Sequence, residues 1–374
     1  VIKTSFLPVS LLASISGNEW LKILLLFVVV LGVLVFVMVV TSLDDKSSMH
    51  LMRAEVPGPE ADKLVPKARE TAKLLYAMYL ALTVAEIIFL LAGGMNLYDS
   101  IIHSFSTAGT GGFANHNSSV AYYDSAYIDG VITVFMILFG INFNMYFLLL
   151  IKDVKSVWKN EEVRAYLGII VAATLVITCN VLSIYKEPLK AFRYSIFQVA
   201  SIITTTGFAT ADFNLWPELS KCILLLIMVI GACAGSTGGG VKVSSFLILW
   251  KSILKQVKGM LHPKSVNVVK VNRKKISNET LQGVYAYFSA YVFVFGISVL
   301  LVALDNFDFA TTISGVLTTL SNVGPGISSV GPIENFKSFS VLYNIVFSMD
   351  MLIGRLEIFP FLMICSPSFW RKHF

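Results

Sequence analysis

Apolar runs long enough to cross a lipid bilayer recur along the whole chain. A helix needs about 20 mostly apolar residues to cross the hydrocarbon, and the run at 21–42 is the first to reach that length. Of the 374 residues, 56% are hydrophobic and only 14% are charged, whereas a globular domain carries about 25% charged residues. We therefore predict an all-α, multi-pass integral membrane protein.

The apolar runs are organised as a repeated unit. Each unit has a long run, a short helix, a Gly-rich stretch and a second long run, and the units occupy 74–151, 165–250 and 283–364. One such unit cannot enclose a pore, but several around an axis can. We therefore predict helix–pore-helix–helix units around a central pore, with about seven membrane spans and three re-entrant pore helices. The other segments are assigned as the remnant of a preceding unit with one span (1–42), a cytoplasmic linker (43–73) and a cytoplasmic tail (365–374).

Basic residues distinguish the two sides of the membrane. Lys and Arg are concentrated in 43–73, 152–164 and 251–280, whereas the segment 94–127 contains neither. By the positive-inside rule those three loops are cytoplasmic, and the Gly-rich stretches open toward the outside. The net charge of +6 is explained by these cytoplasmic loops. It therefore does not indicate binding to a nucleic acid, and the expected partner is the lipid bilayer. The outer side carries three exceptions, Lys186, Lys190 and Arg193.

The Gly-rich stretches lie at 106–114, 203–211 and 320–328 and carry no charge. Inside a bilayer, non-helical backbone is tolerated only where protein buries it or where it lines a watery path. Backbone carbonyls can replace the water of a monovalent cation, and glycine permits the backbone angles that turn them inward. A divalent ion would favour carboxylates, which these stretches lack. The alternative is a set of re-entrant turns or close helix contacts, but three stretches in register favour a pore.

The predicted ion-selectivity filter consists of the glycines and their neighbours in each stretch. The monovalent cation is assigned to Gly111, Gly112, Thr206, Gly207, Val323 and Gly324. The whole predicted filter is Thr110, Gly111, Gly112, Phe113, Thr205, Thr206, Gly207, Phe208, Asn322, Val323, Gly324 and Pro325.

A second Gly-rich segment, 231–243, interrupts the apolar run 219–250. Three consecutive glycines disfavour a helix, since each is worse than Ala by about 1 kcal/mol. The segment is either a simple kink or a flexible intramembrane loop that obstructs the path below the filter. Val241 separates the last Gly from Lys242, so the segment does not match a nucleotide-binding P-loop.

Arg355 lies in the last apolar run, near Asp350 and Glu357. A charge inside the membrane is expensive and is by default a functional hypothesis. Arg355 either has a functional role, in which it restrains the loop or sets the field in the pore, or forms an ion pair near the cytoplasmic interface. Asn142 and Asn144 are interpreted as hydrogen-bonding residues between helices. The predicted gate is Gly235, Ser236, Thr237, Gly238, Gly239, Gly240, Lys242 and Arg355.

No constellation typical of an enzyme occurs in the sequence. The cysteines and histidines show no disulfide or metal-ligand spacing, and no nucleophile–base pattern is present. We predict a protein that is not an enzyme and has no bound organic cofactor.

Several motifs together resemble the Trk/Ktr/HKT superfamily of cation transporters, most closely its bacterial TrkH-type pore subunit. In order they are RAEVPGP (53–59), ARETAK (68–73), HSFSTAGTGGF (103–113), TTTGFATADFNLWP (204–217), GACAGSTGGGVKV (231–243), LSNVGPG (320–326), GRLEIF (354–359) and SPSFWR (366–371). The resemblance covers about 43–374. It implies potassium-channel-like units with one filter glycine each, at Gly112 or Gly111, Gly207 and Gly324, a gate loop at 231–243, and Arg355 facing that loop.

The resemblance also implies a function and partners. It implies uptake of potassium, as the transported ion, across the bacterial inner membrane. It implies a homodimer that associates with a cytosolic, nucleotide-binding regulatory ring like TrkA.

The family's first unit, whose filter residue bears on the preference between potassium and sodium, is not visible, and Val1 is not Met, so we expect that an N-terminal part is missing. The alternatives are a sodium-permeable member, a secondary transporter of a small solute, and a non-conducting fragment. A channel and a symport mechanism both remain open.

Overall fold

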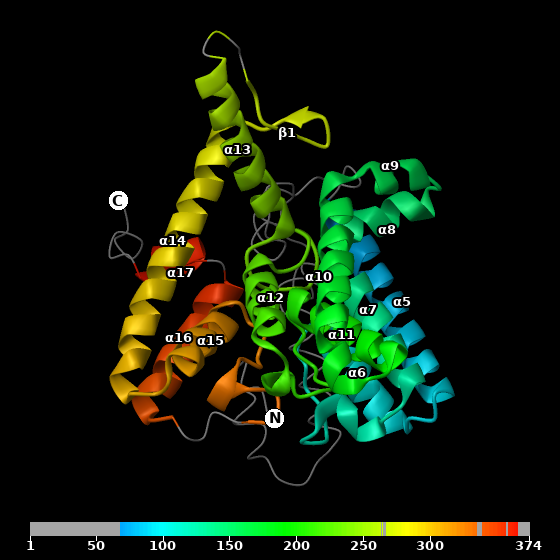
Figure 1. Cartoon of the computed structure of the whole chain (residues 1–374). Coiled ribbons are helices and arrows are strands. Elements are labelled where there is room, and N and C mark those ends of the chain that lie inside the picture. Colours follow the sequence, from blue (N-terminus) through cyan, green and yellow to red (C-terminus); the bar gives the residue numbers. More distant parts are fainter. Residues whose placement is uncertain (1–67, 263, 265–266, 335–338, 357, 366–374) are drawn as a thin grey trace, which may run out of the picture.

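The computed structural model describes residues 68–262, 264, 267–334, 339–356 and 358–365 (Figure 1). The remnant of a preceding unit, most of the linker, Glu357 and nearly all of the tail lie outside these residues. The described part is mostly helical, which confirms the prediction of a helical, apolar membrane protein. Its sheet is a two-stranded antiparallel hairpin, β1 (Lys270–Val271) and β2 (Lys274–Lys275).

The first group of helices is α5 (Ala68–Ala92), α6 (Leu97–Ala108), α7 (Ala126–Phe139) and α8 (Phe143–Leu150). The short helix α6 begins where the Asn96 side chain accepts a hydrogen bond from the Asp99 amide, which satisfies one of the amides left free at a helix start. The 3-10 helix η1 (Ser119–Tyr123) lies between α6 and α7.

The predicted third span, 128–151, is not one straight helix. It is divided into α7 and α8, which meet at 93°. Asn142 starts α8 by accepting a hydrogen bond from the Asn144 amide at 2.9 Å, so its role is a helix cap. Asn142 also lies against Gly235 in the segment 231–243.

The second group begins with α9 (Val154–Lys159) and contains α10 (Glu161–Tyr185), α11 (Pro188–Ile203), α12 (Glu218–Ile230) and α13 (Val243–Leu261). Pro188 occupies the first turn of α11, where its fixed backbone angle suits a helix start. The predicted interruption of 219–250 falls between α12 and α13. The 3-10 helix η2 spans Phe213–Leu215.

The third group contains α14 (Asn278–Val302), α15 (Phe309–Leu320), α16 (Val341–Arg355) and α17 (Ile358–Cys365). Asp308 caps α15 through the Thr311 amide. The predicted last span, 339–364, is divided between α16 and α17. The 3-10 helices η3 (Ala303–Asp305) and η4 (Ser328–Val330) flank α15.

Three described helices are individually long and apolar enough to cross a membrane, and the bent pair α7–α8 counts as a fourth crossing if it is one span. The count is below the predicted seven because α12–α13 and α16–α17 are broken and because 21–42 lies outside the described residues. In Figure 1, α5–α7 and α10–α11 stand on one side and α14–α17 on the other, with α12 between them. The largest apolar cluster joins α10, α11 and α12 and includes the fully buried Tyr166 and Ile202.

At Gly354, α16 approaches the end of α15 so closely that there is no room for a side chain. A Cβ added there would lie 1.9 Å from the Leu320 carbonyl oxygen at the end of α15, and real Cβ atoms do not approach backbone so closely. Gly354 therefore allows α16 to pack on the end of α15.

We predict that Gly354→Ala destabilises the protein by about 1–3 kcal/mol, because an added methyl group overpacks this contact. Thermal unfolding in detergent, followed by fluorescence-detected size exclusion, measures the change. Gly296→Ala on α14 is the matched control, since nothing lies within 4 Å of its added Cβ. Equal melting temperatures for the two variants would contradict the prediction.

Candidate functional site

The three Gly-rich stretches share one backbone conformation at the ends of α6, α11 and α15. Each short helix is followed by a residue with positive φ that is not glycine: Thr110 at 51°, Thr205 at 57° and Asn322 at 57°. Two residues later comes a glycine with positive φ: Gly112 at 64°, Gly207 at 77° and Gly324 at 114°. Gly111 is not in this conformation, so Gly112 is the structural equivalent of Gly207 and Gly324.

The same hydrogen bond closes each turn. The amides of Gly111, Thr206 and Val323 donate to the carbonyls of Ser106, Ser201 and Thr318, at 2.7, 2.9 and 2.9 Å respectively. Each donor immediately precedes its positive-φ glycine, and each acceptor lies five residues before the donor. The stretches are therefore held in register by their own short helices.

A hydroxyl residue six positions before each glycine provides a second tie, which the sequence reasoning missed. Ser106 Oγ accepts from the Phe113 amide. Ser201 Oγ donates to the Phe208 carbonyl at 2.7 Å. Thr318 Oγ1 accepts from the Gly324 amide at 2.7 Å and donates to the Pro325 carbonyl at 3.2 Å. The spacing of a hydroxyl residue six positions before glycine was present in all three stretches and could have identified these residues.

The carbonyls of the three glycines remain available for a ligand. Among the described residues, the carbonyls of Gly112, Gly207 and Gly324 accept no hydrogen bond. Each glycine follows the C-terminus of a short helix, where the helix dipole places partial negative charge. This arrangement suits a dehydrated monovalent cation, because neutral carbonyls can replace its water.

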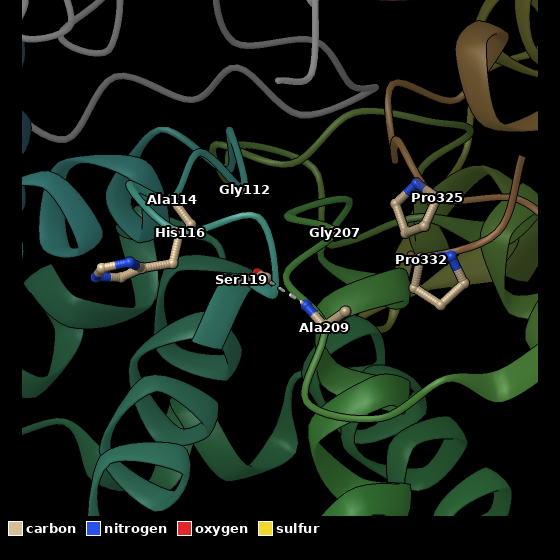
Figure 2. Close-up of a pocket in the computed structure, with 8 residues that line it drawn as sticks. All are labelled: Gly112, Ala114, His116, Ser119, Gly207, Ala209, Pro325 and Pro332. Carbon is tan, nitrogen blue, oxygen red and sulfur yellow. Dashed lines mark hydrogen bonds between the residues drawn. The ribbon is translucent and has the colours of Figure 1, made fainter. Parts of the chain in front are cut away.

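The three stretches meet around a small pocket (Figure 2). The segments around the stretches are also tied to one another: the Ala209 amide donates to Ser119 Oγ of η1 at 3.2 Å, and the Ser328 amide donates to Asn214 Oδ1 of η2 at 2.8 Å. The predicted filter stretches are thus neighbours in space. The pocket is lined by Gly112, Ala114, His116, Ser119, Gly207, Ala209, Pro325 and Pro332.

Asp99, in the first turn of α6, holds residues next to the pocket in place. Its carboxylate accepts hydrogen bonds from Asn96, from Asn115 and from the Tyr123 hydroxyl. Burial by itself raises the pKa of Asp99, but the hydrogen bonds from Tyr123, Asn115 and Asn96 outweigh burial and hold the pKa below its usual value. His116 Nε2 lies 3.9 Å from the same carboxylate. Asp99 therefore fixes the loop that follows Gly112.

The segment 231–243 forms a loop beneath the three stretches, and we call it the gate loop. Its neck is closed by a hydrogen bond from the Val243 amide to the Ala232 carbonyl at 3.0 Å. Gly231 and Gly240 pack against each other, both with positive φ. The Ser236 hydroxyl donates to the Cys233 carbonyl at 2.6 Å.

The distal limb of the gate loop, residues 236–240, contacts all three stretches. Thr110 Oγ1 donates to the Thr237 carbonyl at 3.0 Å, and Thr205 Oγ1 accepts from the Gly239 amide at 2.6 Å. A Cβ added at Gly239 would lie 2.9 Å from the Ser321 carbonyl. A Cβ at Gly238 would lie 3.1 Å from the Thr204 carbonyl. Only glycine fits so close to the ends of α11 and α15.

Two basic side chains contact the same limb. The Lys242 ammonium donates to the Gly238 carbonyl, and Arg355 Nη1 donates to the Thr237 carbonyl at 3.3 Å. Of the two interpretations of Arg355, the structure thus shows contact with the loop. Asp350 is buried and accepts a hydrogen bond from Ser298 at 2.6 Å.

Comparison with known proteins now identifies the family. A family model named TrkH, described as a cation transport protein, matches residues 10–372. The chain belongs to the TrkH family. It is 37% identical over 348 residues to the Trk system potassium uptake protein TrkH of Salmonella typhimurium, a match that covers 91% of this chain and 71% of that protein. It is 31% identical over 348 residues to the Trk system potassium uptake protein TrkG of Escherichia coli, with the same coverage.

A solved TrkH-family structure has the same fold. The crystal structure of the potassium transporter TrkH from Vibrio parahaemolyticus matches with a TM-score of 0.77 at 36% identity, covering 87% of this chain and 70% of that one. The predicted membership of the Trk superfamily, most like the TrkH type, is therefore confirmed, as is a multi-pass membrane protein. The individual filter and gate assignments stay predictions.

We predict that Gly112→Ala impairs ion passage far more than Gly111→Ala. An alanine in the left-handed conformation of Gly112 costs about 1–2 kcal/mol, and relief of that strain would turn a filter carbonyl away. At Gly111 an added Cβ meets the Phe113 ring at 2.8 Å, a side chain that can move. Rubidium flux into proteoliposomes compares the two variants, and a larger loss with Gly111→Ala would contradict the assignment.

Proposed function

We propose that the chain is the pore subunit of a Trk-type potassium uptake system in the bacterial inner membrane. Potassium passes inward through a filter made by the backbone carbonyls of the three stretches. The observation that carries the proposal is the shared conformation at Gly112, Gly207 and Gly324, whose stretches are adjacent and whose carbonyls accept no hydrogen bond within the described part of the chain. The potassium uptake proteins named among the relatives support the choice of ion.

The proposed mechanism relies on these neutral carbonyls. A cation entering from the outside exchanges water for neutral carbonyls, so it is bound without a full counter-charge and can leave again. The C-termini of α6, α11 and α15 favour a cation at this place. The gate loop lies beneath the carbonyls and obstructs the path until its distal limb moves. The proposal includes a homodimer and a cytosolic, nucleotide-binding regulatory ring, whose contact is expected on the basic cytoplasmic face.

Purified full-length protein in potassium-loaded liposomes tests the function. We expect uptake of labelled rubidium driven by the outward potassium gradient, with external potassium competing better than sodium. Equal competition by sodium indicates the sodium-permeable alternative. Saturable uptake of a small solute without ion conductance indicates a secondary transporter. Absence of rubidium uptake, in vesicles that respond to an added potassium ionophore, would contradict the proposal.

We also predict that Arg355→Gln raises the basal rubidium flux. Loss of the hydrogen bond to the Thr237 carbonyl weakens the closed position of the loop by about 0.5–1.5 kcal/mol, which shifts a two-state equilibrium about two- to tenfold. The exposed Lys258 on α13 supplies the control, Lys258→Gln, which removes a cytoplasmic charge away from the loop. An unchanged flux in Arg355→Gln would exclude a restraining role.

A further inference from the structure

The gate loop has a second set of contacts, on the limb opposite the filter. The proximal limb, residues 231–235, packs against the break between α7 and α8 and against the start of α10. The Cys233 amide donates to the Gly140 carbonyl at 3.1 Å, and the Phe143 amide donates to the Gly235 carbonyl at 3.0 Å. Between these contacts, the Ala234 amide donates to Glu162 Oε1 at 2.7 Å.

Glu162 is the side chain that fixes the middle of this limb. It is 7% exposed, although it lies in the first turn of a membrane helix. Burying an acidic side chain is costly unless its oxygens find partners, so its burial here indicates a specific role. Its hydrogen bond to Ala234 spans 72 positions of sequence and joins α10 directly to the gate loop.

The first turn of α10 is itself firmly placed. Asn160 Oδ1 accepts from the amides of Glu162 and Val163 at 2.9 and 3.1 Å. Asn272, in the turn of the β1–β2 hairpin, accepts from the Glu161 amide at 2.8 Å. Lys251 of α13 pairs with the Glu161 carboxylate and donates to the Lys270 carbonyl at 2.7 Å. These contacts fix the first turn of α10, and with it the Glu162 carboxyl, relative to α13, the helix that follows the gate loop.

We propose that Glu162 is a positioning residue of the gate, which holds the proximal limb of the loop in place while the distal limb moves to open the path. The inference rests on the proposed function, since it concerns the gate of that same pore. The two limbs differ in their main partners: the distal limb contacts the stretches and Arg355, and Thr237 Oγ1 also donates to the Phe139 carbonyl at the end of α7 at 3.4 Å. The proximal limb contacts the start of α10 and the α7–α8 break. Glu162 thus sets where the loop hinges.

Hydrogen exchange at the Ala234 amide tests this role without relying on transport. In full-length protein we expect Glu162→Ala to speed exchange of this amide about tenfold or more, because its acceptor is gone and local opening becomes easier. Glu162→Gln keeps an acceptor oxygen and should keep the protection. If the alanine variant does not fold, Glu162→Asp replaces it. Its side chain is shorter by one methylene, so the carboxylate no longer reaches the Ala234 amide and the same faster exchange is expected.

Thr174→Ala is the matched control on the same helix. Thr174 is 2% exposed on α10, and its hydroxyl has no hydrogen-bond partner among the described residues, so its loss perturbs packing without reaching the loop. Unchanged exchange at Ala234 in Glu162→Ala, or an equal change in Thr174→Ala, would overturn the proposal.

Rubidium flux in liposomes separates positioning from general damage. We expect Glu162→Ala to raise basal flux about twofold or more by population shift, with the preference between potassium and sodium unchanged and with Glu162→Gln close to wild type. A lower flux in Glu162→Ala with normal Ala234 exchange would overturn the proposal. If the wild-type protein carries no rubidium, the proposed function fails, whereas the exchange experiment still decides the role of Glu162.

Discussion

Backbone that leaves a helix inside a membrane must still satisfy its polar groups, and the rest of this structure depends on how it does so. After α6, α11 and α15 the chain turns back on its own helix, where one carbonyl and one hydroxyl side chain supply the partners. In each turn the amide before the positive-φ glycine is satisfied by its own helix. Among the described residues the glycine carbonyls accept no hydrogen bond, so the hydrogen bonds that make the turns tolerable also leave three possible cation ligands.

Local structure was largely predictable from the sequence. The short helix predicted in the third unit is α15, and Gly207 and Gly324 have the positive φ that glycine was expected to supply. The choice between Gly111 and Gly112 could not be made from the sequence, because either glycine can adopt such a conformation. The register is fixed by the hydrogen bonds of the Gly111 amide to the Ser106 carbonyl and of the Phe113 amide to Ser106 Oγ.

Long-range structure was not predictable. The run 128–151 is mostly apolar, and its composition does not reveal the 93° bend. At the bend, the Gly140 carbonyl and the Phe143 amide are hydrogen-bonded to the gate loop. The contact of Glu162 with Ala234 has the same origin: an acidic residue at a helix start is usually explained by the helix dipole. Its burial against a loop 72 positions away depends on tertiary packing, which the local sequence does not reveal.

The filter and the gate loop are linked by strain. Thr110 and Thr205 are β-branched and hold positive φ, a conformation that costs on the order of 1–3 kcal/mol and persists only where its surroundings enforce it. The enforcing groups include the gate loop itself, because both threonine hydroxyls bond to its distal limb. Moving that limb removes the hydrogen bonds that support these two residues, two positions before Gly112 and Gly207. In the proposed pore, opening the path therefore relaxes the lower end of the filter, so that the conformation of the filter and the position of the loop depend on each other.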